Sequence, residues 1–178
     1  MGDHGINVQK GAIARSAEEA LEVARSLSNT NGLVVKAQVQ AGGRGKGHLT
    51  SGMKGGVHVV DTPEIIAEKT KGMIGYNLIT HQTTAEGLPV SSVLVHEAVD
   101  IDKQIYLAFL HDRKNQGLCC VYSKKGGMDI EAVAEEDPSA IRTLSFPLVK
   151  ELDVSLAEKI VDDLELTGKT RQQGVEQL

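Results

Sequence analysis

The stretch "VVKAQVQAGGRGKGHLTSGMKGGVHVV", from Val34 to Val60, carries seven glycines between Gly42 and Gly56, with lysines and an arginine among them. A chain uses glycine in this way where the backbone turns sharply or must come close to another group. Valine-rich segments stand at both ends of the stretch, which predicts a strand, a glycine-rich loop and a second strand.

Two common phosphate-binding motifs do not fit this loop. Gly45-Lys46 is followed by Gly47, where a Walker A loop has the Ser or Thr that coordinates magnesium. The dinucleotide fingerprint needs a helix directly after the glycines, whereas Val57-His58-Val59 alternates like a strand. We therefore expect a flap that closes over phosphates, as a Gly-rich loop does in protein kinases on a different fold. The alternative is a long hairpin tip with solvated charges.

The cations of the stretch favour phosphate binding. Lys36 ends the first strand, from where a long side chain can reach the base of the loop. Arg44 lies between Gly43 and Gly45, whose bare backbone can approach oxygen atoms closely.

Composition restricts the remaining possibilities. The chain has 178 residues, 40% of them apolar, which suits one domain or two small subdomains. A net charge of −5 argues against nucleic acid as a partner, and no apolar stretch approaches the ~20 residues of a membrane span. No signal or transit peptide is recognisable. The adjacent Cys119 and Cys120 are expected to be buried thiols, because neighbours on a strand point to opposite faces.

Periodicity and turn residues predict an alternation of strands and helices along the chain. Ser16 and Glu19 form a candidate capping box, Pro63 stands in a first helical turn, and Ser155 is a candidate N-cap. Strands are expected over residues 6–14, 33–39, 57–60, 78–82, 93–98, 105–111, 118–122 and 144–149, and helices over 17–27, 62–73, 130–136, 155–164 and from 168 onward.

Several ordered blocks resemble the β subunit of succinate–CoA ligase, a family with the ATP-grasp fold. They are "VVKAQVQAGGRGKG", "SGMKGGVHVV", "MIGYNLITHQT", "EAVDI" and "GGMDIEAVAEEDP". The resemblance implies an α+β, ATP-grasp chain with a first subdomain over residues 1–104 and part of a second over residues 105–178. In this fold, two subdomains clasp a nucleotide between them.

The resemblance also implies roles for individual residues. Lys36 matches a lysine that contacts the nucleotide phosphates, and Gly43, Arg44 and Gly45 match the phosphate flap. Val99 and Glu97 fall in the linker between subdomains, where the base is contacted. ATP-using bacterial members place their acid one residue earlier, so the register of Glu97 stays open.

Gln9 bears on the choice of base. Guanine presents an oxygen acceptor beside an N–H donor, and a glutamine amide satisfies both. By resemblance, GTP-using members have glutamine at this position, whereas ATP-using bacterial members have proline. The alternative for Gln9 is a polar residue on an edge strand.

The resemblance implies succinyl-CoA/succinate interconversion with GTP/GDP and Mg²⁺, an α-subunit partner, and a place in the mitochondrial matrix, or otherwise in the cytoplasm. The family's phosphohistidine belongs to the α subunit, so the six histidines are assigned structural or surface roles, and no catalytic residue is expected. The magnesium-binding blocks "EVNP" and "FDAK" do not occur here, so metal ligands are expected beyond Leu178. We expect the chain alone to be inactive. The alternatives are an ATP-specific sister subunit and a free-standing nucleotide-binding module.

Overall fold

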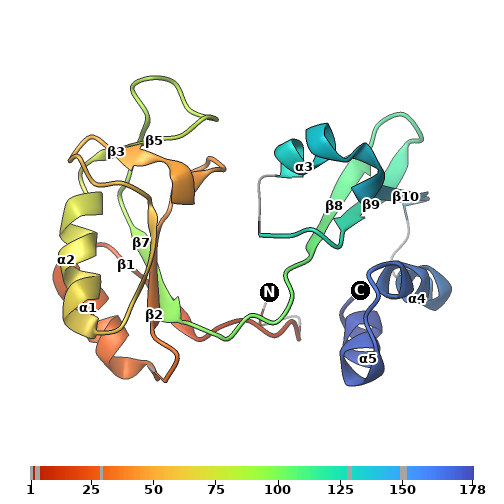
Figure 1. Cartoon of the computed structure of the whole chain (residues 1–178), viewed down its shortest axis with the longest axis horizontal. Helices are drawn as coiled ribbons and strands as arrows, with labels where there is room; N and C mark the ends of the chain where they lie inside the picture. The colour runs from red at the N-terminus through yellow and green to blue at the C-terminus, as the bar shows by residue number, and fades with distance from the viewer. Residues whose placement is uncertain (1, 3–4, 29, 128–129, 149–151) are drawn as a thin grey trace. The chain divides into compact units, whose positions relative to one another are not determined.

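A computed structural model describes residues 2, 5–28, 30–127, 130–148 and 152–178 (Figure 1). The chain forms two compact units. One unit is Asn7–Asp100, and the other is Ile101–Leu178 together with the N-terminal residues up to Ile6. Three of the features discussed above lie outside the described residues: Met128 and Asp129 of the block "GGMDIEAVAEEDP", the predicted strand end at Val149, and His4.

The Asn7–Asp100 unit is built on a four-stranded antiparallel sheet. Its strand order is β1 (Gly11–Ala14), β7 (Val93–Glu97), β2 (Leu33–Ala37) and β4 (Val57–Val60). Helices α1 (Ala17–Ser26) and α2 (Pro63–Met73) lie against each other on one side of these strands (Figure 1). Because side chains alternate across a strand, the helices bury one face of the sheet and leave the other face available.

The core of this unit is aliphatic, as the low aromatic content requires. Val35 and Val95 of the sheet and Ile66 and Met73 of α2 are fully buried in one cluster. Burial of each such side chain contributes about 1.5–3 kcal/mol, so this cluster holds the helices to the sheet.

Side-chain caps fix where both helices begin. Ser16 Oγ accepts a hydrogen bond from the Glu19 amide at 3.1 Å, as the capping-box pattern predicts. The Glu19 carboxylate, however, accepts from the amide of Arg15 and not from that of Ser16. In α2, Thr62 accepts from the Ile65 amide, and Pro63 stands in the first turn.

The predicted strand–loop–strand arrangement is confirmed, with more structure in the loop than the sequence indicated. Strands β2 and β4 pair antiparallel, with Lys36 opposite Val57. The intervening segment contains a 3₁₀ turn at Arg44–Lys46 (η2) and the two-residue strand β3 (His48–Leu49). Strand β3 joins β5 (Asn77–Ile79) and β6 (Leu88–Pro89) in a second small sheet.

The other unit is built on a three-stranded antiparallel sheet in the order β10 (Arg142–Phe146), β9 (Gly117–Ser123), β8 (Tyr106–Asp112). Helices α3 (Ile130–Glu136), α4 (Val154–Asp163) and α5 (Gly168–Gln177) and the 3₁₀ turn η3 (Pro138–Ala140) complete it. Its core cluster contains Cys120, Tyr122, Phe146, Ile160 and Leu164. Both cysteines are free and buried, as expected.

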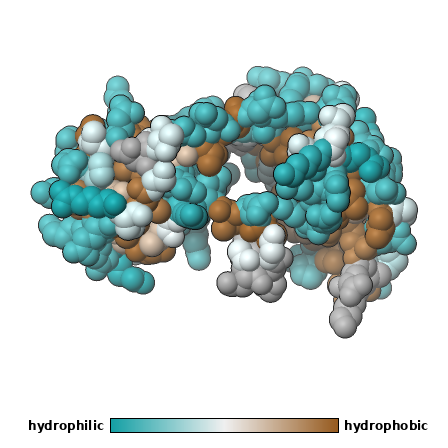
Figure 2. All heavy atoms as spheres, turned by 90° about the horizontal axis from the view of Figure 1, so that it is seen from below, coloured by the Kyte–Doolittle hydropathy of each residue, from teal (hydrophilic) through white to brown (hydrophobic). Residues whose placement is uncertain are grey.

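Apolar side chains also reach the surface of both units (Figure 2). On β8, Leu107, Phe109 and Leu110 are exposed, at the edge of their sheet. Among the helices in the described part of the chain, none combines the length and apolar character needed to cross a bilayer.

Several predicted boundaries need correction. The first strand forms only over Gly11–Ala14 and not from Ile6. Helix α4 is capped by Asp153, whose carboxylate accepts from the Ser155 amide at 2.8 Å, so Ser155 is not the cap. Asp is as good an N-cap as Ser, and the sequence alone does not choose between two candidates this close together.

Candidate functional site

Lys36 lies on the face of the sheet that the helices leave open. Its neighbour Val35 is fully buried beneath the helices, so the Lys36 side chain points to the opposite face. Burial lowers the pKa of Lys36 below its usual value, and the positive charge of Arg44 lowers this pKa further. Among the described residues, no carboxylate contributes to this shift. The ammonium is thus a half-buried cation close to another cation, an arrangement that an anion would relieve.

The glycine loop is anchored at Gly43 and Gly47, and its backbone is open at Gly45. A Cβ added to Gly47 would lie 2.5 Å from the carbonyl oxygen of Ile79 in β5, so the backbone packs tightly there. Gly43 has φ +70°, and a Cβ on it would lie 2.5 Å from His81 Nδ1. Gly45 is exposed, with nothing within 4 Å of an added Cβ. The space above Gly45 is where a ligand could approach the backbone.

Two hydrogen bonds hold the loop in this position, one to the end of β2 and one to a residue 40 positions away in the sequence. Arg44 Nη1 donates to the Ala37 carbonyl at 2.9 Å, and the Gly42 amide donates to Gln82 Oε1 at 2.7 Å. From the sequence, His81 was assigned only a structural or surface role and Gln82 none. The only signal for them was that both belong to the block "MIGYNLITHQT", which resembled the family.

A cationic hollow lies beside the tip of the loop. Its lining includes Gly45, Lys46, His48, Lys54 and His58. Among the described residues that line it, none is Asp or Glu. On a chain of net charge −5, this hollow is a local environment suited to an anion. The two lysines were not singled out from the sequence.

The predicted base-contacting residues lie at the other end of the same sheet. The Glu97 amide donates to the Lys10 carbonyl at 3.0 Å, and Glu97 Oε1 accepts from the Lys10 amide at 3.2 Å. These bonds extend the β1–β7 pairing and bring Gln9 alongside the segment that contains Val99. Gln9 is exposed, and Val99 is 45% exposed. The Glu97 carboxylate already has a backbone partner, whereas Gln9 and Val99 present free surface.

The strand registers order these residues along the sheet. Lys36 is level with Leu94, and Val34 is level with His96 and Gly11. At about 3.3 Å per residue, Lys36 and Gln9 stand about 13 Å apart along the strand direction. The predicted phosphate residues and the predicted base residues therefore belong to one unit, at opposite ends of one sheet. That span suits an extended nucleotide.

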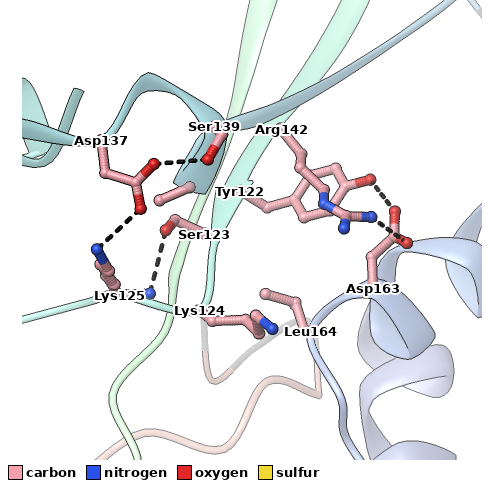
Figure 3. Close-up of a pocket in the computed structure, with 10 residues that line it drawn as sticks. Tyr122, Ser123, Lys124, Lys125, Asp137, Ser139, Arg142, Asp163 and Leu164 are labelled. Atoms are coloured by element: carbon pink, nitrogen blue, oxygen red, sulfur yellow. Dashed lines mark hydrogen bonds and ion pairs between the residues drawn. The ribbon is translucent and has the colours of Figure 1, made fainter.

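A separate cavity of about 320 Å³ lies in the other unit, between β9, β10 and α4 (Figure 3). Tyr122 Oη donates to Asp163 Oδ2 at 2.6 Å, and Arg142 forms an ion pair with the same carboxylate. Burial raises the pKa of Tyr122 to about 12, and the bond to Asp163 raises it too. Lys125 is paired with Asp137 at 3.1 Å. These charges satisfy one another, so the cavity has the character of a structural ion network.

The fold family implies a bound magnesium ion, but the described residues do not form a site that could hold one. Among residues 2, 5–28, 30–127, 130–148 and 152–178, no group of three or more His, Cys, Asp or Glu side chains could hold a metal ion. We therefore derive no chemical step through a metal from this chain.

A sheet with a glycine flap, a lysine at its base and a span of about 13 Å is the arrangement expected of a unit that clasps a nucleotide. The comparison with known families agrees: the ATP-grasp domain matches residues 1–178, and the chain belongs to the ATP-grasp family. The predicted fold class is confirmed. The structure of Ca. Korarchaeum cryptofilum ACD1 in complex with coenzyme A superposes with a TM-score of 0.63 at 19% identity, covering 99% of this chain and 72% of that one.

Among curated relatives, the chain is similar to succinate–CoA ligase β subunits. It is 43% identical over 178 residues to the mitochondrial GDP-forming β subunit of Mus musculus, and covers 41% of that protein. It is 48% identical over 175 residues to the mitochondrial ADP-forming β subunit of Schizosaccharomyces pombe, and covers 40% of it. The resemblance recognised in the sequence is thus confirmed, over about two-fifths of the relatives' length. GDP-forming and ADP-forming relatives are both similar to this chain.

Proposed function

We propose that the chain is the nucleotide-binding part of the β subunit of a succinate–CoA ligase. The observation that carries the proposal is the placement of Lys36, Gly43, Arg44 and Gly45 at one end of the open sheet face. The similarity to succinate–CoA ligase β subunits supports it. In the whole protein, the activity is interconversion of succinyl-CoA and succinate, with an α subunit as partner and Mg²⁺ held by residues outside this chain. As the relatives' names suggest, we place it in the mitochondrial matrix.

The chemical contribution of this unit is electrostatic. Phosphoryl transfer spreads negative charge over the phosphoryl oxygens, and fixed donors around them stabilise that charge. Lys36 supplies an ammonium that has no carboxylate partner within the described part of the chain, and Arg44 has donors beyond the one that contacts Ala37. The open backbone at Gly45 allows an oxygen atom to approach. None of these groups forms or breaks a covalent bond.

We propose GTP/GDP as the nucleotide, with Gln9 reading the base and Val99 and Glu97 lining its end of the site. Gln9 is exposed at the end of the sheet away from the loop, where its amide is available to a base. The alternative is an ATP-specific sister subunit, because ADP-forming relatives are similar to this chain as well.

Calorimetric titration of the 178-residue chain with GDP and with ADP, each with magnesium chloride, tests nucleotide binding. We expect Lys36→Met to weaken binding about ten- to a hundredfold, since a hydrogen bond to a charged group contributes about 1.5–3 kcal/mol. Lys71→Met is the matched control, because this lysine lies exposed on α2 in the same unit. Equal losses in both variants, or binding of neither nucleotide by the unsubstituted chain, would contradict the assignment.

A second experiment separates a ligase fragment from a free-standing module. Mixed with a matching α subunit, succinate, CoA and GTP, the 178-residue chain is expected to form no succinyl-CoA, because no metal site is found among its described residues. Robust turnover would show that the chain is complete for catalysis. A coding sequence that continues into the Asn and Asp metal blocks supports the ligase subunit, and one without them supports the free-standing module.

A further inference from the structure

His96, in strand β7, has an unsatisfied buried nitrogen. The residue is only 7% exposed, and its Nε2 has no hydrogen-bond partner. Within the described part of the chain, no other buried side-chain nitrogen or oxygen lacks a partner. Leaving a buried polar atom unpaired costs about 1–3 kcal/mol, so such an atom calls for an explanation.

The other ring nitrogen defines what Nε2 can do. His96 Nδ1 lies 2.7 Å from the carbonyl oxygen of Glu97, and a carbonyl only accepts, so Nδ1 carries the proton. Burial lowers the pKa of His96, and the charge of Lys36 lowers it too, against the opposing effects of the Glu97 carbonyl and carboxylate. The imidazole is therefore neutral near pH 7, and Nε2 is a bare acceptor that needs a donor.

The register places this acceptor on the open face of the sheet. His96 is level with Val34 and Gly11, and directly paired residues share a face. Lys36 is two residues from Val34 on the same strand, so Lys36 and His96 lie on one face and about 7 Å apart along the strand. A Cβ at Gly11 would lie 2.5 Å from the Cβ of His96, so the glycine beside the ring leaves it room that a side chain would fill.

The order along this face identifies the donor. Lys36 is at the loop end, Gln9 is at the linker end, and His96 is between them. The oxygens of an ionised phosphate accept hydrogen bonds and cannot satisfy a bare acceptor. In a nucleotide that runs from the loop to Gln9, the group between the phosphates and the base is the ribose, whose hydroxyls are donors.

We propose that His96 is a further nucleotide-binding residue, with Nε2 accepting a hydrogen bond from a ribose hydroxyl. This assignment rests on the proposed nucleotide binding of the same unit. From the sequence, all six histidines were assigned structural or surface positions, although the acid of ATP-using bacterial members falls at the position of His96. Lys36 lies on the same face of the sheet, close enough that its charge lowers the pKa of His96.

A chemical double-mutant cycle tests the proposal with the full 178-residue chain. GDP, 2′-deoxy-GDP and 3′-deoxy-GDP are titrated into the unsubstituted chain and into His96→Ala. We expect one deoxy form to bind the unsubstituted chain about three- to tenfold more weakly than GDP, and His96→Ala to lose this discrimination while binding GDP about three- to tenfold more weakly. His111→Ala, at an exposed histidine of β8, serves as the matched control and should keep the discrimination.

The outcomes are separable. If the unsubstituted chain discriminates and His96→Ala discriminates equally, or if neither deoxy form binds more weakly, the His96 assignment is wrong while nucleotide binding stands. If the unsubstituted chain binds neither GDP nor ADP, the proposed function fails first. Should His96→Ala not fold, ¹⁵N NMR of histidine side chains in the unsubstituted chain decides. The Nε2 resonance should move upfield on addition of GDP and stay in place on addition of inorganic pyrophosphate, and no response to GDP would overturn the assignment.

Discussion

Arg44 Nη1 donates to the carbonyl oxygen of Ala37 at 2.9 Å, and this bond ties the glycine loop to the residue that follows Lys36. The bond places two cations close enough that Arg44 lowers the pKa of Lys36. Like charges held together raise the energy of the free chain and favour an anion that neutralises both. A loop that carried Arg44 freely in solvent would lack this preorganisation.

Arg44→Ala should lower nucleotide affinity about ten- to a hundredfold, because it removes a charge-assisted donor as well as the bond to Ala37. The melting temperature should change little, since the loop is also held through Gly42 and Gly47. Calorimetry with GDP and differential scanning fluorimetry measure the two effects. Arg15→Ala, at an exposed arginine before α1, is the control and should bind as the unsubstituted chain does. A large loss of stability in Arg44→Ala would mean that Arg44 is chiefly a structural residue.

Gly45 and Gly47 form a matched pair that separates ligand approach from folding. In Gly45→Ala, the added Cβ has no heavy atom within 4 Å, so the melting temperature should be retained. The same Cβ would occupy the space where a phosphate approaches the backbone, so affinity for GDP should fall several-fold. Gly47→Ala forces a Cβ to within 2.5 Å of the Ile79 carbonyl and should destabilise the unit by about 1–3 kcal/mol, measured by urea unfolding. If Gly45→Ala binds GDP with unchanged affinity, phosphates do not approach the backbone at that residue.

Local sequence signals predicted the elements whose cause is local. Ser16 and Thr62 precede helices α1 and α2 and cap them. The valine-rich segments marked β4 correctly, and they marked β2 from Leu33 but placed its end two residues beyond Ala37. The two-residue strands β3 and β6 carry no periodicity, so they were missed. Their existence depends on pairing with β5 across the chain.

The site divides in the same way. Lys36 and the glycines of the flap were found because they are neighbours in sequence. Gln82, which holds Gly42 over a separation of 40 residues, leaves no local signal. The unpaired nitrogen of His96 is likewise a consequence of sheet register and burial, which appear only once the strands are assembled.

Asp112 should make the stability of the other unit depend on acid pH. Its carboxylate accepts from Ser145 Oγ and from Asn115 Nδ2, each at 2.7 Å, and these bonds, that to Ser145 first, lower the pKa of Asp112 to about 2 from its usual 3.8. A depressed folded-state pKa means that the stabilisation is present above about pH 3.8 and is lost as pH falls through 2.

Melting temperatures of the unsubstituted chain and of Asp112→Asn, followed by circular dichroism from pH 6 to pH 2, test this. The difference between the two should be constant at the upper end and should shrink as pH falls below about 4 toward 2. Ser145→Ala removes the first of these bonds without changing a charge. When Asp112→Asn is made in a chain that already carries Ser145→Ala, the difference in melting temperature should therefore be smaller. A difference that does not vary with pH would show that the Asp112 charge is not involved.

Gln9 should determine the choice between guanine and adenine. Its amide can donate to guanine O6 and accept from the ring N–H, whereas adenine presents the opposite polarity at these atoms. A polar group left unpaired in the wrong complex costs on the order of 1–3 kcal/mol, so the chain should bind GDP roughly ten- to a hundredfold more tightly than ADP. Gln9→Pro removes both contacts and should shrink the ratio of the two affinities, mainly by weakening GDP binding.

Gln9→Glu keeps the side-chain length and one acceptor but replaces the donor with a negative charge, so it should weaken GDP binding selectively. Calorimetry with both nucleotides gives the ratio, and Gln172→Glu on the exposed surface of α5 provides the control. A preference for ADP in the unsubstituted chain, or an unchanged ratio in both Gln9 variants, would remove Gln9 from base recognition and favour the ADP-forming type of subunit.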